Sequence, residues 1–171
     1  MDKKIFFYLI ILILLSGIVG CEKVNTAKLD VNKEIVLQFT EAVNNHNYDE
    51  LDNLVAADFV RHCQATPEVK ITSLKEFKKF AKMYSESFPD MKGSVKMMVA
   101  EGDFVAAYAT FTGTQKGPMG PLPASDKKME SKTIGIFLLE KKKIKELWIE
   151  WDNLAILTQL GHFPPPVPKA E

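Results

Sequence analysis

The most informative stretch of the sequence is Lys145–Gly161, KELWIEWDNLAILTQLG, which combines a strand pattern with a helix pattern. Its first half alternates as a strand does, with one face made of Glu146, Trp148, Glu150 and Asp152 and the other of Leu147, Ile149 and Trp151. An apolar strand face rarely accepts carboxylates, so this strand is the best candidate for a reactive centre. Its second half predicts a short apolar helix from Leu154 that ends at Gly161.

Upstream of this stretch, helical periodicity comes first and strand patterns follow. Apolar spacing predicts a helix from Val31 to about residue 44, a short helix near residues 48–55 and a strand ending at His62. Ser73–Glu76 is a capping box that opens a third helix, which ends near Phe88. Four strands are then expected over residues 95–101, 104–115, 130–140 and 144–152, with a Gly- and Pro-rich loop at 117–126.

Helices followed by strands predict an α+β fold. We expect a cone-shaped roll, in which three N-terminal helices pack on a curved, mostly antiparallel sheet of four to six strands that encloses a pocket. We expect residues 31–163 to form this single domain, and residues 164–171 to be a Pro-rich tail.

The N-terminus has the pattern of an export signal. Lys3 and Lys4 precede an apolar run at residues 5–15 that is short for a membrane span, and Ile18–Cys21 resembles the lipobox of bacterial lipoproteins. We therefore expect residues 1–20 to be a lipoprotein signal peptide, Cys21 to be lipidated and residues 21–30 to be a tether. The protein would then be exported and anchored by lipid to the membrane of the bacterial cell envelope, on its periplasmic or outer-surface face. An ordinary secretory signal and an uncleaved anchor helix are the alternatives.

Composition argues against several classes of function. Basic and acidic residues balance at 22 each, which does not favour a nucleic-acid partner. Acylation of Cys21 would leave Cys63 without a disulfide partner. The three histidines fall in separate expected elements without the spacing of metal ligands, and no Ser has a Gly-x-Ser-x-Gly setting. We expect neither a metal nor a cofactor.

Several short motifs, in their order along the chain, resemble one family. They are His46–Leu51, Ala57–His62, Ser87–Asp90, Ala100–Asp103, Thr110–Thr114, Met119–Gly120, and Glu146–Asp152 with Gln159–Gly161. Together they resemble the SnoaL-like polyketide cyclases, also called predicted ester cyclases, which share an α+β cone with nuclear transport factor 2. The chain departs from the family pattern at Thr66–Ile71, which contains no Gly, and in its proline loop.

The resemblance implies that Asp152 is a general acid/base and that His62 faces the pocket. One carboxylate can serve both roles in ring closure, and burial beside tryptophan would favour its protonated form. Glu150 would modulate Asp152 by charge repulsion, and Trp148, Tyr108 and Phe88 complete the expected substrate pocket. Asp152 as a helix cap and His62 as a structural residue are the alternatives.

Two functions are consistent with these features. The first is a cofactor-independent enzyme that cyclises or isomerises a small apolar carbonyl compound. The second is a non-catalytic lipoprotein of the envelope that binds such a compound in the same pocket. We also expect a homodimer, because a second subunit would bury the apolar face formed by Leu147, Ile149 and Trp151.

Overall fold

The computed structural model describes residues 26–164, which form a single α+β unit. Helix α2 (Thr26–Asn44), the short α3 (Leu51–Leu54), strand β1 (Val55–His62) and helix α4 (Leu74–Ser87) come first. Strands β2 (Lys92–Glu101), β3 (Phe104–Thr114), β4 (Lys128–Glu140) and β5 (Lys143–Trp151) follow, and α5 (Asn153–Leu160) ends the fold. The expected α+β class is confirmed.

The N-terminal boundary differs from the expected one. Helix α2 begins at Thr26, so residues 26–30 of the expected tether are helical. The expected signal peptide, Cys21 and residues 165–171 of the tail lie outside the described residues. No helix within residues 26–164 is long and apolar enough to cross a membrane.

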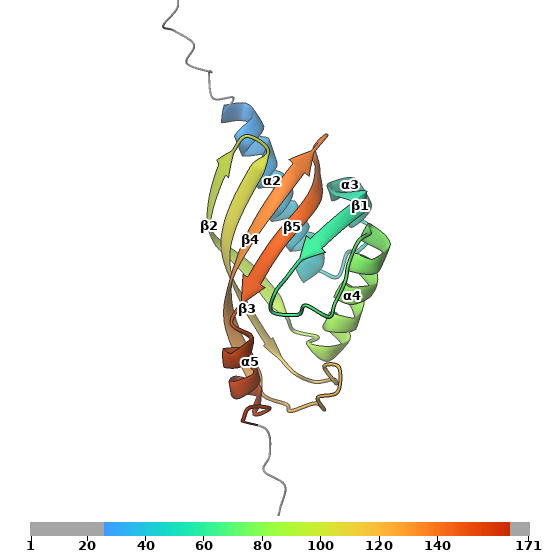
Figure 1. Ribbon diagram of the computed structural model, residues 1–171, viewed down its shortest axis with the longest axis vertical. Helices are drawn as coiled ribbons and strands as arrows, with labels where there is room; N and C mark the ends of the chain where they lie inside the picture. Colours follow the sequence, from blue (N-terminus) through green and yellow to red (C-terminus); the bar gives the residue numbers. More distant parts are fainter. Residues whose placement is uncertain (1–25, 165–171) are drawn as a thin grey trace, which may run out of the picture.

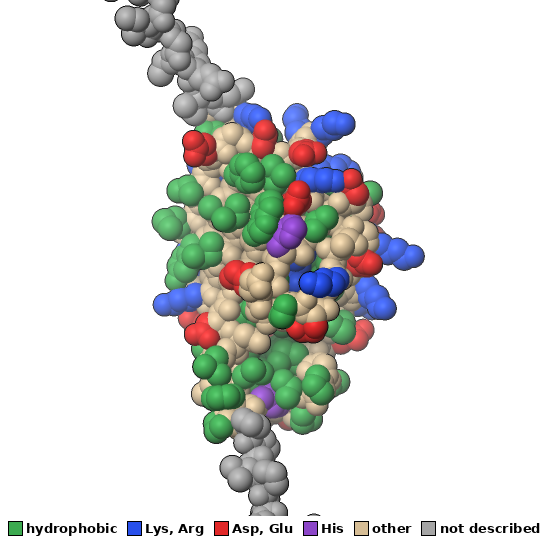
Figure 2. All heavy atoms as spheres, viewed as in Figure 1, with side chains coloured by type: hydrophobic (Ala, Val, Ile, Leu, Met, Phe, Trp, Pro, Cys, Tyr) green, Lys and Arg blue, Asp and Glu red, His purple; other side chains and the backbone are tan. Residues whose placement is uncertain are grey.

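The sheet has five strands in the order β1-β5-β4-β3-β2, which agrees with the expected four to six. Strand β1 pairs in parallel with β5 and all other neighbours are antiparallel. Helix α2 crosses one face of the curved sheet, and α4 lies beside β1 (Figure 1). The face away from α2 has no helical cover among the described elements, and hydrophobic side chains gather on it over the strands (Figure 2).

Local signals in the sequence explain where two helices begin and end. The Ser73 hydroxyl accepts a hydrogen bond from the backbone N–H of Glu76, and the Glu76 carboxylate accepts one from Thr72 N–H at 2.8 Å. This arrangement confirms the capping box. Gly161 has φ +79°, the left-handed conformation that ends α5 as predicted.

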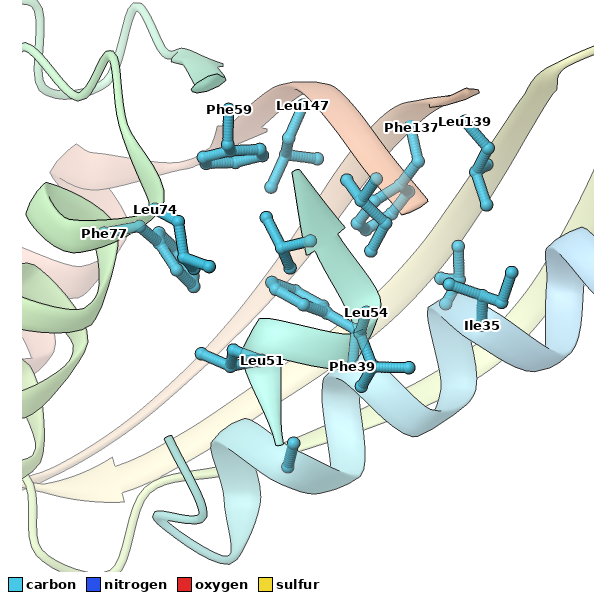
Figure 3. Packing of buried hydrophobic residues seen from close by; sticks show 14 of the residues in the cluster. Ile35, Phe39, Leu51, Leu54, Phe59, Leu74, Phe77, Phe137, Leu139 and Leu147 are labelled. Carbon is cyan, nitrogen blue, oxygen red and sulfur yellow. The ribbon is translucent and has the colours of Figure 1, made fainter. Parts of the chain in front are cut away.

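The core lies between the helices and the concave face of the sheet. Four phenylalanines from different elements meet there: the ring of Phe39 stacks on Phe77 at 5.5 Å and contacts Phe137, and Phe59 meets Phe77 edge-on (Figure 3). A second buried cluster, around Phe88 and Leu160, includes α5. Aromatic packing of this kind fixes the helices against the strands.

Candidate functional site

A cavity of about 170 Å³ lies inside the cone. Residues of α2, α4, α5 and all five strands line it, and most of them are apolar, including Phe39, Phe80, Phe137 and Ile149. No aspartate or glutamate is among the lining residues of the described chain. An apolar cavity on the order of 150 Å³ is large enough to hold a small aromatic molecule.

Arg61 is the charged side chain of this wall with the least solvent exposure, at 7%. Its Nη2 donates to the Thr66 hydroxyl at 3.1 Å, and its guanidinium lies over the rings of Phe80 (5.1 Å) and Trp151 (5.5 Å). Its Nη1 is buried and has no hydrogen-bond partner, and the same is true of Nε1 of Trp151. Both atoms are donors, so the wall holds two unused hydrogen-bond donors.

Two tyrosines contribute hydroxyl groups to the wall. Burial raises the pKa of Tyr84, while the nearby charge of Arg61 opposes this shift more weakly. The Tyr84 phenol therefore stays neutral at physiological pH and is a donor, with its oxygen 3.8 Å from Sδ of Met119. The Tyr48 hydroxyl already donates to the backbone carbonyl of Ala81 at 3.2 Å, which ties the segment after α2 to α4.

The orientation expected for β5 is reversed in the structure. Leu147, Ile149 and Trp151 line the cavity, whereas Trp148 is 37% exposed on the outer face together with Glu150. The prediction that Trp148 and Glu150 line the pocket is therefore wrong. The physical reason is that the helices cover the concave face of β5, so its apolar side chains turn inward and its carboxylates turn to water.

His62 and Glu150 have structural partners on the outer face. His62 Nε2 lies 2.8 Å from Oε2 of Glu146, and the imidazole stacks on Trp148 with ring centroids 4.8 Å apart. Glu150 accepts hydrogen bonds from the backbone N–H groups of Gln64 (2.6 Å) and Ala65 (3.1 Å). Neither His62 nor Glu150 lines the cavity, and Glu150 holds the loop that follows β1.

Asp152 is the N-cap of α5. Its Oδ1 accepts a hydrogen bond from Ala155 N–H at 2.9 Å, and the residue is exposed and absent from the cavity wall. The position matches the helix-cap alternative. The catalytic roles given to Asp152 and His62 stay predictions, without support from the cavity geometry.

The two other expected pocket residues also lie outside the cavity wall. Tyr108 borders a shallow depression on the outer face with Ile134 and Glu150, so its expected place in the main pocket is wrong. Phe88 is fully buried and stacks on Tyr84 at 5.6 Å, so it supports the wall from behind. The arrangement within residues 26–164 offers no group of three or more His, Cys, Asp or Glu for a metal ion.

Sequence reasoning missed Arg61, Tyr84 and Trp151 as wall residues. The signal for Arg61 was present in β1, since Phe59 and Arg61 point to the same side of the strand and Phe59 is fully buried. Arginine is nevertheless a typical surface residue, so alternation alone did not single it out.

Known proteins resemble this chain along most of the domain. A family model for SnoaL-like polyketide cyclases matches residues 33–160. A search of curated proteins found no significant match.

Solved structures share the same architecture. IdmH from Streptomyces antibioticus, which has been proposed to be a polyketide cyclase, is 25% identical with a TM-score of 0.67, over 76% of this chain and 98% of IdmH. TsrD from Streptomyces laurentii is 26% identical with a TM-score of 0.69, over 77% of this chain and 96% of TsrD.

A protein from Jannaschia sp. CCS1, proposed to be a SnoaL-like polyketide cyclase, is 22% identical with a TM-score of 0.71. The match covers 79% of this chain and 94% of the Jannaschia protein, and at this identity it shows the fold alone. The cone, its internal cavity and the family match over residues 33–160 lead to one conclusion: the chain belongs to the SnoaL-like polyketide cyclase family.

Proposed function

We propose that this member of the family binds a small, largely apolar carbonyl compound in the cavity of the cone. The observation that carries the proposal is the wall itself, which is apolar, encloses about 170 Å³ and contains hydrogen-bond donors without a carboxylate. Such a wall favours a ligand whose oxygen accepts hydrogen bonds and whose skeleton is apolar.

Binding can be measured with the intrinsic fluorescence of Trp151. The sequence has two tryptophans, so Trp148→Phe leaves Trp151 in the cavity wall as the only reporter. We expect acetophenone, a small aromatic ketone, to quench this fluorescence saturably. A matched variant that also carries Ala109→Phe fills the cavity from β3 and should lose the quenching. Equal quenching in the two variants would contradict binding in this cavity.

Acid/base chemistry on the bound ketone is the second candidate, as in a cyclase or isomerase. The observation that favours it is the match of residues 33–160 to the family of SnoaL-like polyketide cyclases. Asp152 follows the cavity residue Trp151, and its carboxylate would have to leave its cap on α5 to act on a ligand. Exchange of the methyl protons of acetophenone in D₂O, followed by NMR, tests this without knowledge of the natural substrate. Acceleration that Asp152→Asn abolishes supports the enzyme, and binding without acceleration supports the binding protein.

We further propose that the protein forms a homodimer through the outer sheet face. The residues first expected there line the cavity instead, so the proposal rests on other side chains. Exposed apolar residues of β2, β4 and β5 form a row that Ala106 and Tyr108 of β3 join: Met97, Val99, Ile134, Ile136 and Trp148. A row of this kind on an uncovered face is typical of an interaction surface (Figure 2).

The export and lipidation proposed from the sequence concern residues outside the described range. We propose that Cys21 carries the lipid and anchors the domain to the membrane of the cell envelope. Metabolic labelling with a fatty acid should mark the wild-type protein and leave Cys21→Ser unlabelled. Labelling that persists in the variant would contradict the assignment.

A further inference from the structure

Arg61 carries a buried positive charge that the folded domain leaves without a counter-ion. None of the ion pairs found among residues 26–164 involves Arg61, and its Nη1 has no hydrogen-bond partner. Burial of an unpaired charge is strongly unfavourable. The two aromatic rings under the guanidinium compensate only part of this cost, because a cation–π contact satisfies no N–H group.

A second unused donor lies beside this charge. The guanidinium is 5.5 Å from the ring of Trp151, whose Nε1 is also buried without a partner. Both residues line the cavity, and the neutral Tyr84 phenol lines it as well. This side of the cavity therefore combines one cation with further N–H and O–H groups. The described residues of the wall include no carboxylate that could neutralise the cation.

One nitrogen of the guanidinium is anchored by the protein. The hydrogen bond that the structure shows for its side chain goes to the Thr66 hydroxyl, in the loop after β1. The other nitrogen, Nη1, therefore stays available to an oxygen atom in the cavity. Charge-assisted hydrogen bonds of guanidinium to an anionic oxygen are about twice as strong as neutral ones.

We propose that the cavity selects ligands that carry an ionised oxygen, as an enolate or carboxylate, on an apolar skeleton, and that Arg61 and Trp151 hold this oxygen. The inference rests on the proposed function, since it names the ligand chemistry of the same cavity. A carbonyl compound that gives up a proton to the buffer, from its acidic carbon or from its enol oxygen, would bind as the enolate. Arg61 would then stabilise the negative oxygen that an aldol cyclisation also develops.

The test uses benzoylacetone, a β-diketone whose neutral and enolate forms share one skeleton and differ in ultraviolet absorption. Its apparent pKa is titrated with and without excess protein. We expect the protein to lower the pKa by about one unit, which corresponds to about tenfold tighter binding of the enolate. Arg61→Met should remove the shift, and Trp151→Phe, which removes the N–H donor and keeps a smaller aromatic ring, should reduce it.

Acetophenone binding to the protein with an intact cavity wall, measured by quenching of Trp151 in Trp148→Phe, separates this inference from the proposed function. Circular dichroism with urea unfolding shows that Arg61→Met and Trp151→Phe fold, so a lost pKa shift in these variants reports the lost donor. A wild-type protein that binds acetophenone and leaves the pKa of benzoylacetone unchanged would overturn the anion site and leave the binding function intact. A wild-type protein that binds neither probe would overturn both.

Discussion

The role of Asp152 can be decided by two substitutions that separate a helix cap from a catalytic acid. The carboxylate accepts a hydrogen bond from Ala155 N–H at the start of α5. Asp152→Ala removes this bond and the charge near the positive end of the helix. Asp152→Asn keeps a side-chain oxygen that can accept the same bond, because Asn and Asp are about equally good N-caps.

The hydrogen bond and the charge that each substitution removes determine the expected loss of unfolding free energy. Loss of an N-cap hydrogen bond costs about 1 kcal/mol, within a range of about 0.5–2. Loss of the charge alone costs roughly 0.3–1 kcal/mol at an exposed helix end. Asp152→Ala should therefore lower the free energy of unfolding by about 1–2 kcal/mol, and Asp152→Asn by about 0.5. Because α5 buries Ile156 and Leu160, loosening of its first turn should lower the stability of the whole domain.

Urea unfolding followed by circular dichroism measures both values. Glu140→Ala is the matched control, since it removes an exposed carboxylate at the end of β4 that caps no helix, and it should change stability by less than about 0.5 kcal/mol. Equal losses for Asp152→Ala and Asp152→Asn would refute the cap. Unchanged stability in both would leave the carboxylate free for chemistry and favour the enzyme.

Three further predictions concern the pKa of Asp90, the loop after β1 and the outer face. Hydrogen bonds from the Thr114 hydroxyl and N–H lower the pKa of Asp90, so its stabilisation is present above about pH 4 and is lost as the pH falls through the folded-state pKa. Asp90→Asn should therefore flatten the loss of unfolding free energy below pH 4 in urea titrations, and an unchanged slope would refute the linkage. Glu150→Gln weakens the acceptor for the backbone of Gln64, so amide hydrogen exchange should speed up there; unchanged protection would show that the loop is held otherwise. Ile136→Glu places a charge in the apolar row and should convert the expected dimer to monomer in size-exclusion chromatography with light scattering, and a persistent dimer would exclude this face.

The sequence predicted the elements of the fold well because their local signals agree with the tertiary structure. The capping box at Ser73 and the Gly161 stop each depend on only a few neighbouring residues. Alternation then identified β4 and β5 as strands. The parallel pairing of β1 with β5 depends on contacts across about 90 residues of chain, and it was not predicted.

The site was predicted poorly because alternation defines two faces without saying which one is inside. Trp148 and Trp151 place an indole on each face of β5, so aromatic content did not distinguish them. The carboxylates did indicate which face of β5 is outside. Glu146 and Glu150 find partners on the outer face, and a dry cavity would have left them unpaired. Arg61 was missed for the opposite reason, because its burial departs from what its residue type favours.

A crystal structure of the domain with benzoylacetone would show directly whether Arg61 and Trp151 hold the oxygen of the ligand. We expect the ligand to occupy the cavity between α2, α4 and the sheet, with one oxygen about 3 Å from Nη1 of Arg61 or Nε1 of Trp151. A ligand bound only on the outer face, near Tyr108 and Glu150, would contradict it, as would a ligand in the cavity with its oxygens turned away from Arg61 and Trp151.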